Sequence, residues 1–239
     1  MVKTNEHRSI LGLVLFLILF GNIRSQEYDV AIWGITVGTA ELEQIADNEM
    51  SFKLNSNEFI DYVFPVDLYY YSKYDKNNYT IIENKKMTEQ GTEEQNYEAI
   101  LDDNNVLVYN DQDSNSLEPN THSLISLLIK LMNSTIDSID TKWLNLENEG
   151  ILYKTRFLWN DTTTISLKNK DILCDHYRLD LKIFNDDSKI FEKTDYFNEL
   201  FFDINSIRQI WVEKWQKKQR IIKITIKNSL VSLTIAIKN

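Results

Sequence analysis

Apolar and polar side chains alternate along most of this chain, and this two-residue period constrains the fold more than any other feature. Successive side chains of a β-strand point to opposite faces, so alternation predicts strands with one apolar and one polar face. The pattern is clearest near the end of the chain, where residues 222–226 and 231–237 alternate on either side of the turn Asn228-Ser229. Two such strands predict an antiparallel hairpin in a sheet that is solvated on one side.

Similar segments recur along the chain and predict about ten to twelve strands. In the first of them the phase slips at Trp33-Gly34, which favours a bulge or a close approach of two backbones. Residues 111–120 are polar and are expected to form a loop, whereas residues 190–202 are aromatic but follow no clear period. The predicted strands lie within residues 28–42, 51–54, 59–71, 80–86, 93–100, 106–109, 151–159, 177–183, 206–215, 222–226 and 231–237.

One helix is clearly predicted after Pro119. Four leucines between residues 124 and 131 follow the spacing i, i+3, i+4 and i+7, and Ser123 or Thr121 is the expected N-cap. Residues 131–146 either extend this helix or form a second short one. We therefore predict a mainly β fold with one or two helices. In this fold a curved antiparallel sheet, or incomplete β-barrel, carries a helix over its concave face and encloses either a cavity or a filled core.

The first 25 residues have the organisation of a secretory signal peptide. A short basic segment precedes the apolar residues 10–20, and Ser25 is a small residue after which cleavage is expected. The apolar run is about half of the ~20 residues that a membrane-spanning helix needs. We therefore predict a signal peptide over residues 1–25 and a single exported domain over residues 26–239. An uncleaved membrane anchor is the alternative.

Charge and cysteine content narrow the location and the partners. The chain has a formal net charge of -10 and one cysteine, Cys174. An acidic chain is unsuited to nucleic acid, whose binding requires clustered Lys and Arg. A single cysteine allows no intrachain disulfide, whereas secreted eukaryotic domains of this size often carry them. These features favour a protein of the bacterial cell envelope, and the periplasm is its expected location.

The sequence contains no catalytic constellation that predicts a reaction. Cys174 and His176 share one face of a predicted strand, whereas a catalytic Cys–His pair must meet across a cleft. A structural zinc site needs four ligands from separated pairs, and the other histidines are His7 and His122. Paired carboxylates fall in predicted turns, and the motifs of nucleotide-binding proteins and serine hydrolases are absent. We therefore expect no enzymatic activity, no metal and no cofactor, with a hydrolase as the least favoured alternative.

Several short motifs resemble those of one family of exported bacterial proteins. The opening segment 28–40, with its Val37-Gly38-Thr39-Ala40 step, resembles the start of the domain of unknown function DUF3108. Phe64-Pro65-Val66 resembles the central strand of that family, residues 174–179 resemble its C-x-x-Y-x-L strand, and Ile210-Trp211-Val212 resembles its closing strand. The resemblance covers residues 27–237. It implies a curved, incomplete barrel similar to the lipoprotein carriers of the envelope, with a binding shell for a lipid or another apolar partner.

Aromatic side chains supply the candidate ligand contacts. They ordinarily fill a core, but ligand sites are also lined by apolar and aromatic groups. We single out Trp33, Phe157, Trp159 and Trp211 as candidate lining residues. The hypothesis is a non-enzymatic envelope protein that binds a lipid-like or apolar ligand inside a half-barrel. The alternative is a scaffold or interaction module that binds a protein or glycan partner through its sheet edges or the Tyr-rich segment 69–71.

Overall fold

The computed structural model describes residues 24–110, 112–167, 170–186, 190–214 and 219–238. The predicted signal peptide therefore lies outside the described residues, except for Arg24 and Ser25, which begin the first strand. The predicted domain boundaries, 26–239, stay a prediction. Within the described ranges, no helix is long and apolar enough to cross a membrane.

In the described part of the chain, fifteen strands form one sheet, in the order β8-β7-β6-β5-β4-β3-β2-β1-β15-β14-β13-β12-β11-β10-β9. Neighbours are antiparallel except for β9 and β10, which are parallel. The strands are β1 Arg24–Ile32, β2 Ile35–Ala46, β3 Glu49–Ser56, β4 Val66–Tyr74, β5 Ile81–Gln90, β6 Glu93–Leu101, β7 Val106–Tyr109, β8 Asp113–Ser116, β9 Thr121–His122, β10 Leu144–Asn148, β11 Ile151–Leu167, β12 Lys170–Asn185, β13 Ile207–Glu213, β14 Ile221–Lys227 and β15 Ser232–Ile237.

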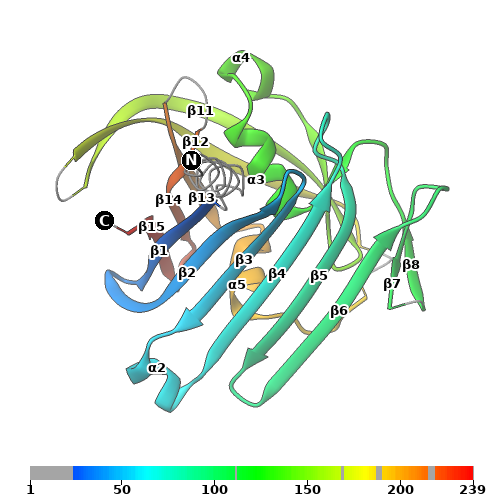
Figure 1. Ribbon diagram of the computed structural model, residues 1–239, viewed down its shortest axis with the longest axis horizontal. Helices are drawn as coiled ribbons and strands as arrows, with labels where there is room; N and C mark the ends of the chain where they lie inside the picture. The colour runs from blue at the N-terminus through cyan, green and yellow to red at the C-terminus, as the bar shows by residue number, and fades with distance from the viewer. Residues whose placement is uncertain (1–23, 111, 168–169, 187–189, 215–218, 239) are drawn as a thin grey trace, which may run out of the picture.

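The sheet curls strongly but does not close into a barrel (Figure 1). β1 lies in its middle, between β2 and β15, so the first and last described strands are hydrogen-bonded neighbours. The predicted mainly β fold with a curved antiparallel sheet is confirmed. The prediction of one or two helices was too low, because four are described: α2 Glu58–Val63, α3 Leu124–Met132, α4 Ile136–Ile139 and α5 Tyr196–Phe202.

Helix α3 lies in the hollow of the sheet and begins at its predicted N-cap (Figure 1). The Ser123 hydroxyl accepts a hydrogen bond from the Ser126 amide at 3.1 Å, and the Ser126 hydroxyl accepts one from the Ser123 amide at 2.9 Å. This reciprocal pair is a capping box, which satisfies amides that would otherwise be unpaired at a helix start. Side chains are buried around most of the helix, as expected for a helix inside a core.

The Trp33-Gly34 phase slip is the turn of the β1–β2 hairpin. Both residues have positive φ, 50° and 82°, the combination that a two-residue hairpin turn requires. The prediction of a bulge or a close backbone approach at this position was therefore wrong, because a turn shifts the alternation in the same way. The register shift of the β1–β2 ladder lies instead between Val30 and Ala31 of β1, and Val30 pairs with Gly38 of β2.

Three further segments differ from the prediction. The segment 59–71 is not one strand: α2 occupies its start, with the Asn57 side chain accepting from the Ile60 amide at 3.0 Å. It ends before Pro65, since a residue that precedes proline is disfavoured in helical conformation. The polar loop 111–120 contains β8, a short polar strand of the kind that sheet edges favour. The unphased segment 190–202 contains α5.

Side chains connect distant parts of this open sheet around one buried lysine. Lys86 of β5 is fully buried, and its ammonium lies 2.7 Å from Asp195 Oδ2 and forms a second ion pair with Glu149. It also donates to Gln95 at 2.8 Å and to Thr194 at 3.0 Å. Glu149 belongs to the β10–β11 turn and Asp195 is the N-cap of α5, so Lys86 joins three elements that share no backbone pairing with one another.

The end of β10 and the β10–β11 turn make further polar contacts with the edge formed by β7 and β8. The Tyr109 hydroxyl donates to the Glu147 carboxylate, and the Asn115 amide donates to the Gly150 carbonyl at 2.8 Å. Burial raises the pKa of Glu147 to about 7, because a charged carboxylate is poorly solvated there. These polar contacts, together with the apolar packing of Leu152 of β11 in one cluster with Leu107 of β7, therefore connect the two ends of the sheet without a strand ladder.

We predict that Lys86→Met lowers the free energy of unfolding by about 3–5 kcal/mol, because it leaves two buried carboxylates without their cation. Urea denaturation of purified protein measures this loss. The matched control is Lys85→Met at the next position. Lys85 is half-exposed and pairs with Glu83 and Glu98 at the surface, so its loss is expected to cost less than about 1 kcal/mol. Equal losses in the two variants would contradict the structural role given to Lys86.

Candidate functional site

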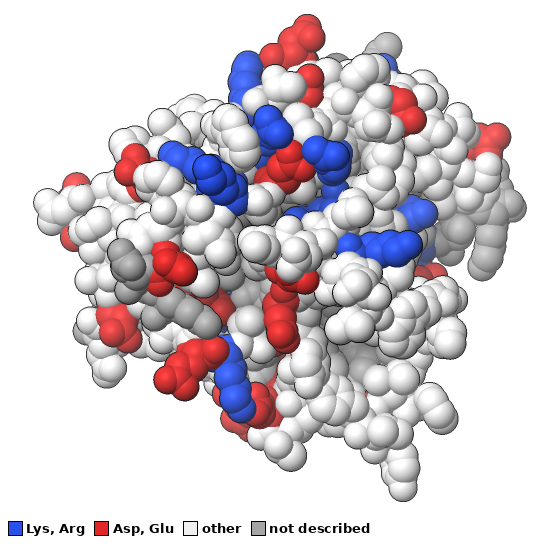
Figure 2. Space-filling view, turned by 180° about the vertical axis from the view of Figure 1, so that it is seen from behind, with Lys and Arg blue, Asp and Glu red and all other residues white. Residues whose placement is uncertain are grey.

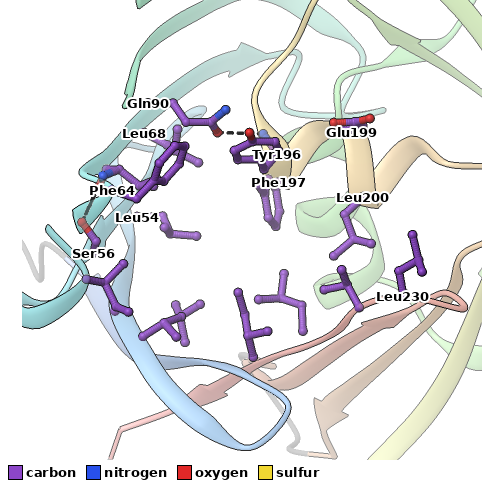
Figure 3. Close-up of a pocket in the computed structure, with 18 of the residues that line it drawn as sticks. Leu54, Ser56, Phe64, Leu68, Gln90, Tyr196, Phe197, Glu199, Leu200 and Leu230 are labelled. Atoms are coloured by element: carbon purple, nitrogen blue, oxygen red, sulfur yellow. Dashed lines mark hydrogen bonds between the residues drawn. The ribbon is translucent and has the colours of Figure 1, made fainter. Parts of the chain in front are cut away.

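An apolar cavity of about 550 Å³ lies on the concave side of the sheet, near α2 and the β1–β2 turn (Figure 3). Its volume lies within the ~300–1,000 Å³ that is usual for ligand pockets. The sheet, α2, α5 and the β14–β15 turn all contribute to its lining. The lining residues are Val30, Ile32, Val37, Gly38, Leu54, Ser56, Ile60, Phe64, Val66, Leu68, Gln90, Tyr196, Phe197, Glu199, Leu200, Asp203, Asn228, Leu230, Val231 and Leu233.

Strand alternation builds the sheet wall of the cavity. Val30, Leu54, Leu68 and Leu233 are buried, lie on four different strands and all point toward the concave side. Leu54 and Leu68 are direct cross-strand partners. Because inward side chains of neighbouring strands lie side by side, the wall is a continuous aliphatic surface.

Helix α5 forms the opposite wall, and its N-terminal end is held firmly against the sheet. One oxygen of Asp195 caps the helix by accepting from the Asn198 amide at 2.9 Å. The other accepts from the Tyr70 hydroxyl at 2.6 Å, in addition to its ion pair with Lys86. The Gln90 side chain accepts from the Tyr196 amide at 2.8 Å (Figure 3).

The C-terminal end of α5 is tied to the other side of the hollow. Asp203 follows the helix, and its carboxylate accepts from the Asn228 side chain at 3.2 Å, in the β14–β15 turn. A hydrogen bond from the Asn205 amide lowers the pKa of Asp203 below its ordinary value, so this carboxylate is charged at neutral pH. Fixed at both ends, α5 presents Phe197 and Leu200 to the cavity (Figure 3).

Few polar side chains line the cavity, and those that carry charge are all acidic. Glu199 and Asp203 are the charged lining residues, and Ser56, Gln90 and Asn228 are the neutral polar ones. Neither Lys nor Arg belongs to the lining. The cavity therefore offers an apolar interior and a negative, hydrogen-bonding border, which suits an amphiphile better than a fully polar molecule.

Helix α2 borders the cavity through one of its faces. Ile60 and the C-cap residue Phe64 belong to the lining. The Phe64 ring packs against Tyr196 of α5, with 5.6 Å between ring centroids. A side chain at Gly91 would lie 2.9 Å from the Phe64 ring, so the glycine in the β5–β6 turn leaves room for this ring. Phe64 and Tyr196 thus connect α2 to α5 beside the opening (Figure 3).

The four aromatic residues selected from the sequence lie in separate places, and none lines this cavity. Trp33 is exposed in the β1–β2 turn, and Trp159 is partly exposed on β11. Phe157 is buried in the main core, with its ring edge toward Tyr177. Trp211 lies on the outer face of the sheet, stacked on His176 with 4.3 Å between ring centroids. A ligand contact at these four residues stays a prediction.

Sequence reasoning missed the residues that do line the cavity. More than half are Val, Leu or Ile, drawn from strands, helices and a turn, and such residues look the same in a filled core and in a cavity wall. A usable signal lay in the segment after Asp195, where Phe197, Leu200 and Phe201 follow helical rather than strand spacing. Asp195, three residues before Asn198, also fits a helix N-cap.

The Cys174–His176 pair lies on the outer face of β12. Cys174 is buried in a small outer cluster with Ile172 and Ile222, and burial raises the pKa of its thiol to about 11. His176 Nδ1 lies 3.1 Å from Asp161 Oδ1. Among the described residues, no three His, Cys, Asp or Glu side chains are grouped as a metal site would require.

Comparisons with known proteins bear on the fold alone. No family model matches the sequence, and no curated protein matches it. A beta-barrel-like protein of the domain of unknown function DUF1849 from Brucella abortus has a similar structure, with a TM-score of 0.56 and 10% identity over 91% of this chain and 98% of that chain. The hypothetical lipoprotein YmcC from Escherichia coli aligns with a TM-score of 0.39 and 9% identity, over 100% of this chain and 99% of that chain. The first likeness supports a beta-barrel-like fold, and the resemblance to DUF3108 stays a prediction.

We predict that Gly38→Ala narrows or distorts the cavity wall and destabilises the protein by about 1–3 kcal/mol. A Cβ at this position would lie 2.2 Å from the Asn55 carbonyl oxygen, so β2 and β3 would have to move apart. Thermal unfolding measures the effect, and Thr39→Ala at the exposed neighbouring position is the control. Equal stability of Gly38→Ala and the parent protein would show that the two strands separate at no cost.

Proposed function

We propose that this protein is a non-enzymatic, exported protein of the bacterial envelope that binds a lipid-like amphiphile in its half-barrel. The observation that carries the proposal is the apolar cavity of about 550 Å³ between the sheet and α5. An empty apolar space of this size forfeits the packing contacts that a filled core would gain, so it is costly to keep without a ligand. A bound apolar group would restore those contacts.

The charges at the cavity narrow the class of ligand. Glu199 and Asp203 are acidic, and no Lys or Arg belongs to the lining. A ligand with an anionic headgroup would meet repulsion there and would find no cation to pair with. We therefore favour an amphiphile with a neutral or zwitterionic headgroup, whose apolar chain occupies the cavity and whose polar end reaches Gln90 or Asn228.

Export and the periplasmic location remain part of this proposal. They rest on the signal-peptide organisation of residues 1–25 and on the resemblance to DUF3108. The similar fold of the DUF1849 protein is compatible with the incomplete barrel that this resemblance implies. The absence of enzymatic activity is likewise proposed. The Ser56 hydroxyl in the lining donates to the Asp61 carboxylate at 3.0 Å, and neither His nor Cys belongs to the described lining.

Binding of an apolar fluorescent probe tests the proposal. We predict that the double variant Val37→Trp, Val231→Trp lowers probe affinity at least about tenfold, because two indole rings fill the space that the probe needs. Both valines line the cavity and are half-buried, so the fold can accept larger side chains there. Val108→Trp, on β7 and away from the cavity, is the size-matched control. Probe binding that survives the double variant would contradict a ligand site in this cavity.

A second candidate function, binding to an acidic protein or glycan partner, is favoured by the outer face of β11–β14. Figure 2 shows Lys and Arg gathered around a carboxylate on the face seen from behind. Strand register places Lys154 beside Lys182, Arg156 beside Asp180, and Lys223 beside Trp211, all on the side opposite to the main core. Arg156 and Arg178 share one carboxylate, that of Asp180, so the pairing leaves the patch with a positive charge. This charge stands out in a chain whose net charge is -10.

We predict that Lys182→Glu, Lys223→Glu weakens retention of the protein on an anionic polysaccharide matrix, because it reverses two charges of the patch. The salt concentration needed for elution is the measurement. The control Lys76→Glu, Lys193→Glu makes the same change in net charge at exposed positions outside the patch. Equal elution of the two variants would assign any retention to net charge and remove the support for this second function.

A further inference from the structure

Helix α2 has two apolar faces, although it is only six residues long. Ile60 and Phe64 line the cavity. Phe59, Tyr62 and Val63 are spaced i, i+3 and i+4 and are 78%, 93% and 73% exposed. None of the residues of α2 is buried. Soluble proteins rarely expose neighbouring large apolar side chains without a use for them, so the outward face of α2 needs a partner.

The exposed apolar side chains continue around the cavity on neighbouring turns. Leu230, in the β14–β15 turn, lines the cavity and is 76% exposed. Tyr196, at the start of α5, is also exposed and packs on Phe64. Trp33 is exposed in the β1–β2 turn, whose backbone donates to the Ser232 carbonyl at 2.9 Å and so lies next to the β14–β15 turn. We call Trp33, Phe59, Tyr62, Val63, Tyr196 and Leu230 the apolar lip.

The charged residues that line the two hollows beside the lip are acidic. A hollow on the outer side of α2 is lined by Glu58, Asp61, Asp67 and Glu89, with neither Lys nor Arg in its lining. The cavity adds Glu199 and Asp203. An anionic surface would be repelled by these carboxylates, whereas a neutral surface would meet only the apolar and aromatic side chains.

We infer that the apolar lip docks the protein onto a zwitterionic lipid bilayer and places the cavity opening against the lipid. Phe, Tyr and Trp side chains partition into the interface between lipid headgroups and chains, which matches the composition of the lip. The lip surrounds a cavity rather than a closed surface, so an amphiphile in the bilayer would reach the cavity without crossing water. The inference of docking rests on the exposed side chains of the lip alone. A role for docking in loading or releasing a ligand rests on the proposed function.

A fluorophore placed on the lip tests docking at one position, independently of any membrane binding by residues 1–25. Tyr62→Cys is labelled with an environment-sensitive dye, and the single native cysteine, Cys174, is buried. On addition of phosphatidylcholine vesicles to the full chain, the emission at position 62 should increase and shift to the blue. Met87→Cys, exposed on β5 and outside the lip, is the control and should not change. No change at position 62, or an equal change at position 87, would overturn the inference.

A second variant separates docking from ligand binding. The triple variant Phe59→Gln, Tyr62→Gln, Val63→Gln keeps good helix formers and removes the outward face of α2. Flotation with phosphatidylcholine vesicles should weaken about tenfold or more, since three apolar side chains no longer enter the interface. Binding of the apolar probe without vesicles should be unchanged, because none of the three residues lines the cavity. The control Met87→Thr, Ile100→Thr, Leu173→Thr removes three exposed apolar side chains elsewhere and should float like the parent.

The outcomes of the two experiments are distinct. Failure of the parent protein to bind the probe would refute the cavity function and leave docking intact, whereas undiminished flotation of the triple variant would refute docking alone.

Replacing half of the phosphatidylcholine by phosphatidylglycerol should weaken docking at low salt and restore it at high salt, as charge repulsion is screened. Stronger docking on the anionic vesicles would overturn the assignment to a neutral surface. A concentration-dependent emission change at position 62 without vesicles would instead identify a second copy of the chain as the partner of the lip.

Discussion

The buried Lys86 ammonium is the interaction on which the arrangement of this open sheet depends. It stands between Glu149 in the β10–β11 turn and Asp195 at the start of α5, so it joins parts of the molecule that no strand ladder connects. A buried ion pair gains little net stability over apolar packing, but its loss leaves buried charges unpaired. The ion pairs of Lys86 therefore act chiefly by fixing the position of α5, because this helix cannot leave the sheet without exposing or separating the buried charges.

The position of α5 in turn decides what the hollow of the sheet contains. α3 is surrounded by core residues and fills one part of the interior. α5, held by Asp195 at one end and by Asp203 at the other, crosses the hollow and leaves a space between itself and the strands β1–β4 (Figure 3). Large side chains do not fill that space, and Gly38 in its wall contributes no side chain. The proposed ligand site and the apolar lip both follow from this one placement.

Local patterns were reliable where a segment's own chemistry determined its conformation. The hairpin of β14 and β15 and the helix capped by Ser123 were predicted correctly, since alternation and a capping serine act within a few residues. α2 was mistaken for the start of a strand, because the two-residue spacing of Tyr62 and Phe64 conceals a helix that Asn57 begins and Pro65 ends. The residues chosen as ligand contacts were selected because aromatic groups often line ligand sites, whereas the cavity wall consists mostly of aliphatic residues that resemble any core.

The sequence by itself determined that this chain forms a largely antiparallel, curved sheet around an apolar interior, because the two-residue period sends every second side chain to the same face. It also determined the acidic character of the chain and the basic segments of β11–β14 that alternate with core residues. Only the tertiary structure decided that the interior keeps a cavity, and where that cavity opens. Those properties depend on which strand faces come together across the hollow, and on a lysine whose partners lie 63 and 109 residues further along the chain. No local pattern records such distances.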